Sequence, residues 1–383
     1  MDTSILPVIT VKHPKRLLMG HPWVFSNEII IDRPAKALPQ GSVVRLVDSH
    51  NRFLGIGYFN PHSLISVRVL SYQDEAIDAV WVENRLRKAA ELKDRLVGKP
   101  YYRLVHSESD GLPGVICDRF GDVFVVQLNT AGADFLQPVL EKAIQKTFSA
   151  KQIIFKQEQS IRRLENIPIV ESEASLIVEG EEGPVRFLAD VGQGQKTGWF
   201  YDQRDNRALF ASLCKGKTVL DCYSFTGSFG LYAAKAGAKS VLAIDRSEAA
   251  LDMVKKNAEL NGVSIETRQG EAFDVLAMMD ETFDCVMIDP PAFIKVKKDH
   301  AVGLKGYTKL VKLAQKCVKP GGILMFTSCS HHATLDDLRG ILSHVFTKRG
   351  ARILKTLCAG PDDPTHPHLV ESSYLKGFLL QLD

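Results

Sequence analysis

The sequence of 383 residues has no hydrophobic run long enough to cross a membrane. A membrane-spanning helix needs roughly 18 uncharged apolar residues in succession, and no stretch approaches that length. The first residues, MDTSILPVITVKHPKR, also lack the apolar core of a signal peptide. We therefore expect a cytoplasmic protein with no membrane partner.

Cysteine is sparse and lacks the spacing of a metal or redox motif. The chain has 7 cysteines, an odd number, and no C-x-x-C pair. Neither a disulfide framework nor a zinc knuckle is indicated, so we expect mostly reduced, buried thiols and no metal site. The seven are Cys117, Cys214, Cys222, Cys285, Cys317, Cys329 and Cys358.

Net charge is also small, at +3 from 48 basic and 45 acidic residues. That value alone does not indicate a nucleic-acid-binding protein. The charge is uneven, however, because residues 1–73 have eight basic and four acidic side chains. A basic segment beside a near-neutral remainder fits an RNA-binding module attached to a catalytic body, since phosphate contacts use Lys and Arg. A solvated basic surface is the alternative.

The rhythm of apolar residues divides the chain into three parts. Residues 1–73 have short alternating runs broken by Pro, Gly and Asn, which predict a small antiparallel sheet or barrel. A helical stripe over 75–97, ended by Gly98 and Pro100, is expected to join domains. Within 74–180, two β-rich runs, a helix over 138–148 and a strand near 152–155 indicate an α+β domain.

From residue 181 onward, apolar strands alternate with helical patterns. This alternation predicts an α/β domain with a doubly wound parallel sheet, and a helix is expected over 248–260. In such sheets ligands bind at the carboxyl ends of the strands. The expected strands are 219–223, 241–245, 265–269, 285–289, 323–328, 351–357 and 378–382.

Three successive strand ends have residues suited to an adenosine-bearing ligand. The first strand leads into the turn Asp221 to Gly230, whose glycines permit close approach of a ligand. This turn lacks the pattern G-x-G-x-x-G, so a dinucleotide is disfavoured. Asp245, at the end of the second strand, can accept hydrogen bonds from ribose hydroxyls, and Gly270-Glu271 ends the third, near an adenine. Each acid alone is more often a helix cap, but three in register favour adenosine without phosphates.

The fourth and fifth strand ends have candidate catalytic groups. The turn Asp289-Pro290-Pro291-Ala292-Phe293 offers carbonyls to a planar base with an exocyclic amine, and Phe293 could stack on that base. A plain Pro-Pro turn is as common. Cys329 lies in Thr327-Ser328-Cys329-Ser330-His331-His332 and should open to the same edge as Asp289. A lone cysteine is usually a buried hydrophobe, but this polar setting favours a reactive thiol. The two adjacent histidines lack a third ligand at metal spacing.

These motifs resemble the RlmI-type family of bacterial class I S-adenosylmethionine-dependent methyltransferases, which make 5-methylcytosine in large-subunit (23S) ribosomal RNA. Four further strings match family signatures: His21-Pro22-Trp23-Val24-Phe25, Glu108 to Gly114, Lys196-Thr197-Gly198 and Asp202-Gln203-Arg204. The resemblance implies a PUA domain over 1–73, a central α+β (EEHEE) domain over 74–180 and a Rossmann-like methyltransferase domain over 181–383.

The resemblance also implies roles for particular residues. Cys329 would be the nucleophile that adds to C6 of cytosine, and Asp289 would orient the base. Relatives often have Asp at the position of Glu271. The residues expected around the S-adenosyl-L-methionine cofactor are Lys196, Tyr201, Gln203, Arg204, Asp221, Ser224, Phe225, Thr226, Gly227, Asp245, Arg246, Glu271, Ala272 and Asp289.

Two other functions stay open at this point. Amino methylation of a base at the Asp289-Pro290-Pro291 turn would leave Cys329 structural, and a non-catalytic RNA-binding assembly factor could keep the cofactor fold. The sequence does not identify the RNA position, or whether free RNA or an assembling ribosome is the substrate. The group that removes the C5 proton and the choice between a monomer and a homodimer are open as well.

Overall fold

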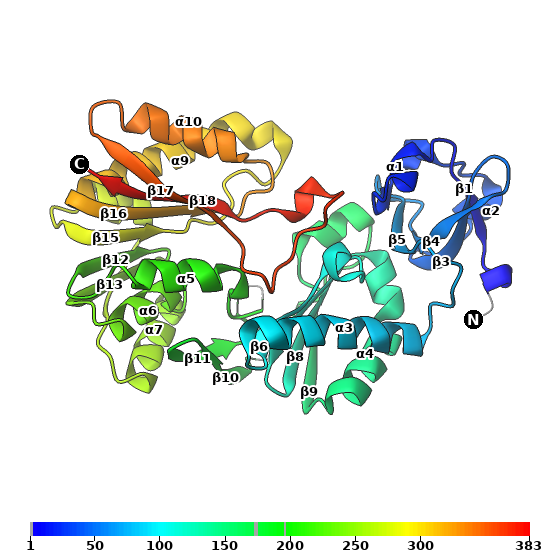
Figure 1. Cartoon of the computed structure of the whole chain (residues 1–383), viewed down its shortest axis with the longest axis horizontal. Helices are drawn as coiled ribbons and strands as arrows, with labels where there is room; N and C mark the ends of the chain where they lie inside the picture. Colours follow the sequence, from blue (N-terminus) through cyan, green and yellow to red (C-terminus); the bar gives the residue numbers. More distant parts are fainter. Residues whose placement is uncertain (1–2, 172–174, 195–196) are drawn as a thin grey trace. The chain divides into compact units, whose positions relative to one another are not determined.

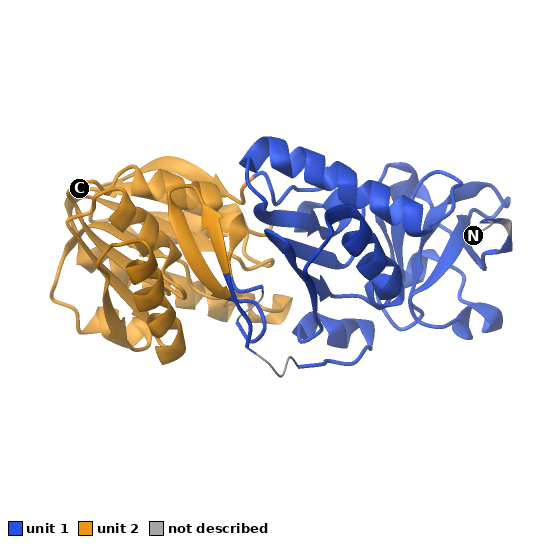
Figure 2. Cartoon of the chain, turned by 90° about the horizontal axis from the view of Figure 1, so that it is seen from below, with its two compact units in different colours: residues 1–178, 190–198, 361–372 blue, residues 179–189, 199–360, 373–383 orange. Residues whose placement is uncertain are grey.

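The computed structural model describes residues 3–171, 175–194 and 197–383. The chain folds into two compact units, each described here by itself (Figure 2). Unit 1 comprises residues 1–178, 190–198 and 361–372, and unit 2 comprises residues 179–189, 199–360 and 373–383. Among the described residues, no helix is both long and apolar enough to cross a bilayer.

Unit 1 begins with a five-stranded sheet in the order β1-β3-β4-β5-β2. The sheet is mostly antiparallel, as expected, but β1 runs parallel to β3 because the intervening chain is long enough to cross back. The short helices α1 (Lys15–Leu18) and α2 (Arg33–Lys36) lie in that connection. The strands are β1 (Val8–Thr10), β2 (Trp23–Val24), β3 (Ser42–Val47), β4 (Phe53–Phe59) and β5 (Val67–Ser71).

A four-stranded sheet, β6-β7-β8-β9, follows in unit 1. The helix expected to join domains instead packs on this sheet, with Val82 and Leu86 in its core. The second helix starts at Ala131, earlier than expected, because the Thr130 side chain accepts a hydrogen bond from the Ala133 N–H and caps it. The elements are α3 (Ala79–Val97), β6 (Tyr101–His106), β7 (Val115–Phe120), β8 (Val123–Leu128), α4 (Ala131–Phe148) and β9 (Gln152–Lys156).

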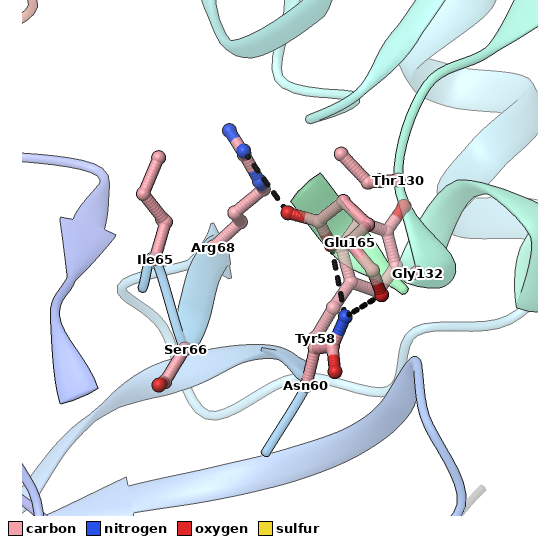
Figure 3. Close-up of a pocket in the computed structure, with 8 residues that line it drawn as sticks. All are labelled: Tyr58, Asn60, Ile65, Ser66, Arg68, Thr130, Gly132 and Glu165. Carbon is pink, nitrogen blue, oxygen red and sulfur yellow. Dashed lines mark hydrogen bonds and ion pairs between the residues drawn. The ribbon is translucent and has the colours of Figure 1, made fainter. Parts of the chain in front are cut away.

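Two buried glutamates connect the sheets of unit 1. Glu108 Oε1 lies 2.7 Å from Arg68 Nη1 and accepts a hydrogen bond from Trp23 Nε1 at 2.6 Å. Glu165 accepts from Asn60 Nδ2 at 3.1 Å beside a small polar cavity (Figure 3). This cavity, of about 10 Å³, is large enough only for a water molecule. The sequence motifs that contain Trp23 and Glu108 therefore contact each other within unit 1, where the contact stabilises the fold.

Unit 2 contains a seven-stranded sheet in the order β14-β13-β12-β15-β16-β18-β17. The expectation of a parallel sheet is correct except at β18, which runs antiparallel to both β16 and β17. The reason is that β18 follows β17 through a loop without a crossover helix. The strands are β12 (Thr218–Cys222), β13 (Ser240–Asp245), β14 (Glu266–Gln269), β15 (Phe283–Ile288), β16 (Val318–Ser328), β17 (Ala351–Cys358) and β18 (Lys376–Leu382).

Helices cover both faces of this sheet (Figure 1). α5 (Arg204–Ala211), α6 (Ser228–Lys235) and α7 (Glu248–Leu260) lie on one face. α8 (Ala272–Ala277), α9 (His300–Ala314) and α10 (Leu335–Val345) cover the other. A hairpin of β10 (Ile177–Glu182) and β11 (Val185–Asp190) precedes them. Since β12 to β16 are parallel, their carboxyl ends share one edge, which we call the strand-end site.

Candidate cofactor site and nucleophile

The loop between β12 and α6 has an unusual backbone. Tyr223, Phe225 and Gly227 have φ angles of 62°, 50° and 83°, in the left-handed region. Each non-glycine residue there costs roughly 1–2 kcal/mol, so surrounding contacts must hold the loop. One such contact is the hydrogen bond from the Ser224 N–H to the Ile244 carbonyl, at 3.0 Å. Loops of this kind are typical of ligand-binding sites.

Two aspartates fix this loop from neighbouring strands. Asp245 Oδ2 accepts a hydrogen bond from the Phe225 N–H at 2.9 Å, and its Oδ1 accepts from the Ser247 N–H at 2.9 Å. Asp221 Oδ2 accepts from the Gly230 N–H at 2.9 Å, at the start of α6. Both carboxylates keep further acceptor capacity, because a carboxylate has about four lone-pair positions.

The strand-end site is acidic. Burial, followed by the charges of Asp289 and Asp245, raises the pKa of Asp221 to about 7, while the Gly230 N–H and the Arg207 cation oppose this shift. The negative charges that disfavour the ionisation of Asp221 would be partly neutralised by a bound cation. The site therefore suits a ligand with positive charge.

A polar network holds Asp289. Gln203 Nε2 donates to Asp289 Oδ2 at 2.9 Å, and Thr327 Oγ1 donates to Asp289 Oδ1 at 2.6 Å. Asn206 Nδ2 donates to Gln203 Oε1 at 2.7 Å and to the Cys358 carbonyl at 3.1 Å. This network brings Gln203, Asp289 and the end of β16 together.

Cys329 lies in a turn, and hydrogen bonds fix the serines on either side of it. Ser328 Oγ donates to the Tyr307 hydroxyl at 2.8 Å, and the same hydroxyl lies 2.7 Å from Ser330 Oγ. Ser330 Oγ also accepts from the Ile294 N–H at 3.2 Å, which connects this turn to the segment after Asp289. Cys329 is half-buried between two fully buried serines.

The other cysteines differ from Cys329 in position or exposure. Five of the seven are buried, so the expectation of mostly buried thiols is confirmed. Cys358 is exposed, and it ends β17 at the same sheet edge because β17 and β16 point the same way. The described residues contain no cluster of three or more His, Cys, Asp or Glu side chains that could hold a metal ion.

Comparisons with known proteins show which families this chain matches. A PUA-like domain model matches residues 8–72, and an S-adenosylmethionine-dependent methyltransferase model matches residues 132–378. Ribosomal RNA large subunit methyltransferase I of Erwinia tasmaniensis is 34% identical over 95% of this chain and 96% of its own length. The protein of that name from Shewanella amazonensis is 35% identical over 96% and 97%.

The chain belongs to the ribosomal RNA large subunit methyltransferase I family. It is an S-adenosylmethionine-dependent methyltransferase with a PUA-like domain, as the family resemblance implied. Solved structures share its fold. A putative SAM-dependent methyltransferase from Streptococcus mutans has a TM-score of 0.80 at 20% identity, covering 98% of this chain and 100% of its own. A putative methyltransferase complexed with SAH has a TM-score of 0.82 at 20% identity, with the same coverage.

The strand-end site fits the cofactor of this methyltransferase family. S-adenosylmethionine has two cationic groups, which the acidic site would attract. Ser224 Oγ is buried and has no hydrogen-bond partner among the described residues, so a ligand's polar group could satisfy it. When bound, the cofactor supplies an activated methyl group.

The remaining expected cofactor residues lie in three settings. Thr226 and Ala272 are buried, whereas Arg246 and Glu271 are exposed and 3.7 Å apart. Lys196 lies outside the described residues. Arg204 lies 3.5 Å from the fully buried Glu182 carboxylate, and its guanidinium carbon lies 5.2 Å from the ring centre of the buried Tyr201.

Phe293, expected to stack on a substrate base, packs against other aromatic rings. Its ring centre lies 4.6 Å from that of Tyr307 and 5.9 Å from that of Phe273. Packing against the core of unit 2 therefore accounts for this residue.

Sequence reasoning missed four residues that shape the site. Asn257, fully buried on α7, donates to the Thr226 carbonyl and accepts from the Leu188 N–H. Its signal is a polar residue on the apolar face of a predicted helix. Asn206 and Tyr307 lie in helices α5 and α9, which were not predicted, and Glu182 lies in a strand that no motif marks.

A second candidate surface lies on the PUA-like domain. It is a pocket of about 480 Å³ lined by apolar side chains and by the exposed side chains of Lys12, Lys36 and His62. Such a surface can take both the base and the phosphate of a nucleotide. The residues around it are Lys12, Ser26, Ile29, Ile31, Lys36, Pro61 and His62.

Proposed function

We propose that this methyltransferase transfers a methyl group to C5 of a cytosine in large-subunit (23S) ribosomal RNA, through a covalent adduct on Cys329. The observation that carries the proposal is the position of this half-buried thiol. It lies in a fixed turn directly after β16, the strand whose Thr327 donates a hydrogen bond to Asp289. The substrate comes from the names of the relatives, which are ribosomal RNA large subunit methyltransferases I.

The chemistry explains why a thiol is needed at this place. C5 of cytosine is too poor in electrons to take a methyl group unaided. Addition of the Cys329 thiolate to C6 would move an electron pair to C5, and this carbon would then take the methyl group, whose bond to the sulfonium sulfur breaks and leaves its electron pair on sulfur. Loss of the C5 proton to a base restores the C5–C6 double bond and expels the thiolate.

Asp289 would orient the base in this reaction. Its two carboxylate oxygens are held by Gln203 and Thr327, so its direction is fixed before substrate arrives. A cytosine in structured RNA would have to turn out of its stack to reach this position.

The cofactor would be held by the loop and acids of the strand-end site. Ser224, Phe225, Thr226 and Gly227 would supply backbone and hydroxyl contacts, with Asp221 behind them. Asp245 would accept the ribose hydroxyls. Gln203, Arg246, Glu271, Ala272 and Asp289 would complete the site, together with Lys196, Tyr201 and Arg204 from the preceding segment.

The RNA would be bound by the PUA-like domain over residues 1–73. In the sequence, this domain would be followed by the central domain over 74–180 and the methyltransferase domain over 181–383. The pocket edged by Lys12 and Lys36 supports this assignment, because ammonium groups beside an apolar wall suit an RNA backbone and a stacked base.

Product analysis tests the reaction. Ribosomal RNA from cells that lack this protein is incubated with enzyme and tritiated S-adenosylmethionine, and the labelled nucleoside is identified by chromatography. The proposal expects 5-methylcytidine from the wild-type protein and none from Cys329→Ala. An N-methylated nucleoside made equally by both proteins would instead establish amino methylation, with Cys329 as a structural residue.

A further inference from the structure

Lys376 is placed beside the Cys329 turn by the pairing of β16 with β18. In this antiparallel pair, Ser328 lies opposite Lys376. The Lys376 ammonium donates to the Ser330 carbonyl at 2.9 Å and to the Ala333 carbonyl at 2.8 Å. The cation is therefore held by the segment that begins with Cys329.

The lysine is half-buried, so its charge acts through a medium that screens less than water does. Burial lowers the pKa of Lys376, while the charges of Cys329 and Asp337 oppose that shift. The two carbonyl acceptors offset part of the desolvation, because they face the ammonium protons. Coupling between two charges is reciprocal, so an ammonium that is stabilised by a thiolate also stabilises that thiolate.

We propose that Lys376 is a positioning residue that stabilises the thiolate form of Cys329 and so prepares it to attack the base. The inference rests on the proposed role of Cys329 as nucleophile. Lys376 itself touches neither substrate nor cofactor in this account, and its contribution is electrostatic.

Two titratable groups from other elements interact electrostatically with Cys329: Lys376 from β18 and Tyr307 from α9. Asp337 from α10 interacts with Lys376, and His331 and His332 follow Cys329 in its own turn. The tyrosine is neutral in the physiological range because burial raises its pKa. Histidines are largely neutral at alkaline pH, so an effect of positive charge measured there belongs to Lys376.

The experiment measures the rate of alkylation of Cys329 by iodoacetamide against pH, resolved by mass spectrometry of the peptide that contains it. No RNA and no methyl transfer are needed, so a failure of the proposed function would not alter the result. Lys376→Met removes the charge, Lys376→Arg keeps it, and Lys355→Met removes an exposed charge from β17 as a matched control.

The proposal expects the midpoint of the profile to rise by about one pH unit in Lys376→Met, which slows alkylation about tenfold below the midpoint. Lys376→Arg and Lys355→Met should keep the wild-type profile. An unchanged midpoint in folded Lys376→Met would overturn the proposal. If that variant does not fold, the wild-type protein decides. Its Cys329 midpoint must lie below that of the same thiol in denaturant, and a midpoint at or above that value overturns the proposal.

Discussion

At the scale of single residues, the carboxylates at the strand ends hold groups of the fold and, in the proposed site, would also bind the ligand. Asp245 uses both oxygens to hold backbone N–H groups of the loops on either side, before any ligand binds. Asp289 is likewise oriented by Gln203 and Thr327. Substitutions at such residues should alter cofactor binding through loop geometry as well as through lost contacts.

Asp245→Ala should weaken S-adenosylmethionine binding by roughly 1.5–3 kcal/mol, about tenfold to more than a hundredfold. The physical reason is the loss of the ribose acceptor and of the hydrogen bond that fixes Phe225. Calorimetric titration measures the change, with Asp252→Ala as the control, because Asp252 is an exposed acid on α7 that pairs with Lys255. Equal affinity in the two variants would remove Asp245 from the site.

Asp221 should give the protein without cofactor a distinct dependence of stability on pH. Its pKa of about 7 lies above the ordinary value near 4, so the folded chain keeps a proton that the unfolded chain releases between those values. The stabilising contribution is therefore complete below about pH 4 and is lost as the pH rises through 7. Integration over that range gives at most about 4 kcal/mol.

Asp221→Asn should remove this dependence, because the amide oxygen can still accept from the Gly230 N–H but binds no proton. Urea unfolding at several pH values measures it. The expected result is a free energy of unfolding that falls less between pH 4 and 7 than in the wild-type protein. Parallel pH profiles for the two proteins would show that Asp221 titrates in its ordinary range.

At the scale of elements, some features of the fold could be predicted from residues close together in the chain, and others could not. The helix expected over 248–260 is present with those bounds, because Ser247 caps its first turn and its apolar stripe is regular. The grouping of the strand ends at one edge also followed from the sequence, since parallel strands place their carboxyl ends together. These features depend on residues close together in the chain.

Other features depend on pairing between distant segments and have no local signal. The antiparallel direction of β18 and its register opposite Ser328 place Lys376 beside Cys329. The contact of Asn206 with Gln203 needs only one helical turn, but its second partner, Cys358, is remote in the sequence. Residues 361–372 pack in unit 1 although the strands they connect lie in unit 2.

The loop between β12 and α6 should not tolerate a side chain at its glycine. Gly227 has a φ of 83°, and a Cβ there would lie 3.0 Å from Val254 Cγ1. Gly262→Ala is a matched control, because Gly262 has a φ of 63° with open space around it. Both variants should lose roughly 1–2 kcal/mol of stability from backbone strain. Only Gly227→Ala should also weaken cofactor binding, and equal cofactor affinity in both would contradict this role of the loop.

At the scale of the whole molecule, RNA binding is assigned to a domain that cannot simply be removed. Deleting residues 1–73 would take Arg68 away from Glu108 and leave that buried glutamate without its ion pair. Tyr58 and Leu70 also belong to a core that continues into the four-stranded sheet. Charge reversal in the full chain is therefore the sounder test of the basic pocket.

Lys12→Glu with Lys36→Glu should weaken RNA binding and flatten its dependence on salt, because each lost phosphate contact lowers the slope by roughly 0.7–0.9. Cofactor affinity should not change. Lys88→Glu with Lys142→Glu, on α3 and α4, changes the net charge by the same amount and should affect RNA binding less. An identical dependence of RNA affinity on salt in the two double variants would exclude the pocket as the RNA-binding surface.

The central claim is that Cys329 forms a covalent bond to the target base. The most direct measurement uses ribosomal RNA with 5-fluorocytidine at the target. A base can remove hydrogen from C5 as a proton but cannot remove fluorine, so the adduct should persist after methyl transfer. The account predicts a denaturant-stable protein–RNA conjugate that requires S-adenosylmethionine and maps to Cys329. It should be absent in Cys329→Ala and present in Cys358→Ala, whose thiol is exposed at the same sheet edge. A conjugate on another cysteine, or methylation by Cys329→Ala at the wild-type rate, would contradict the account.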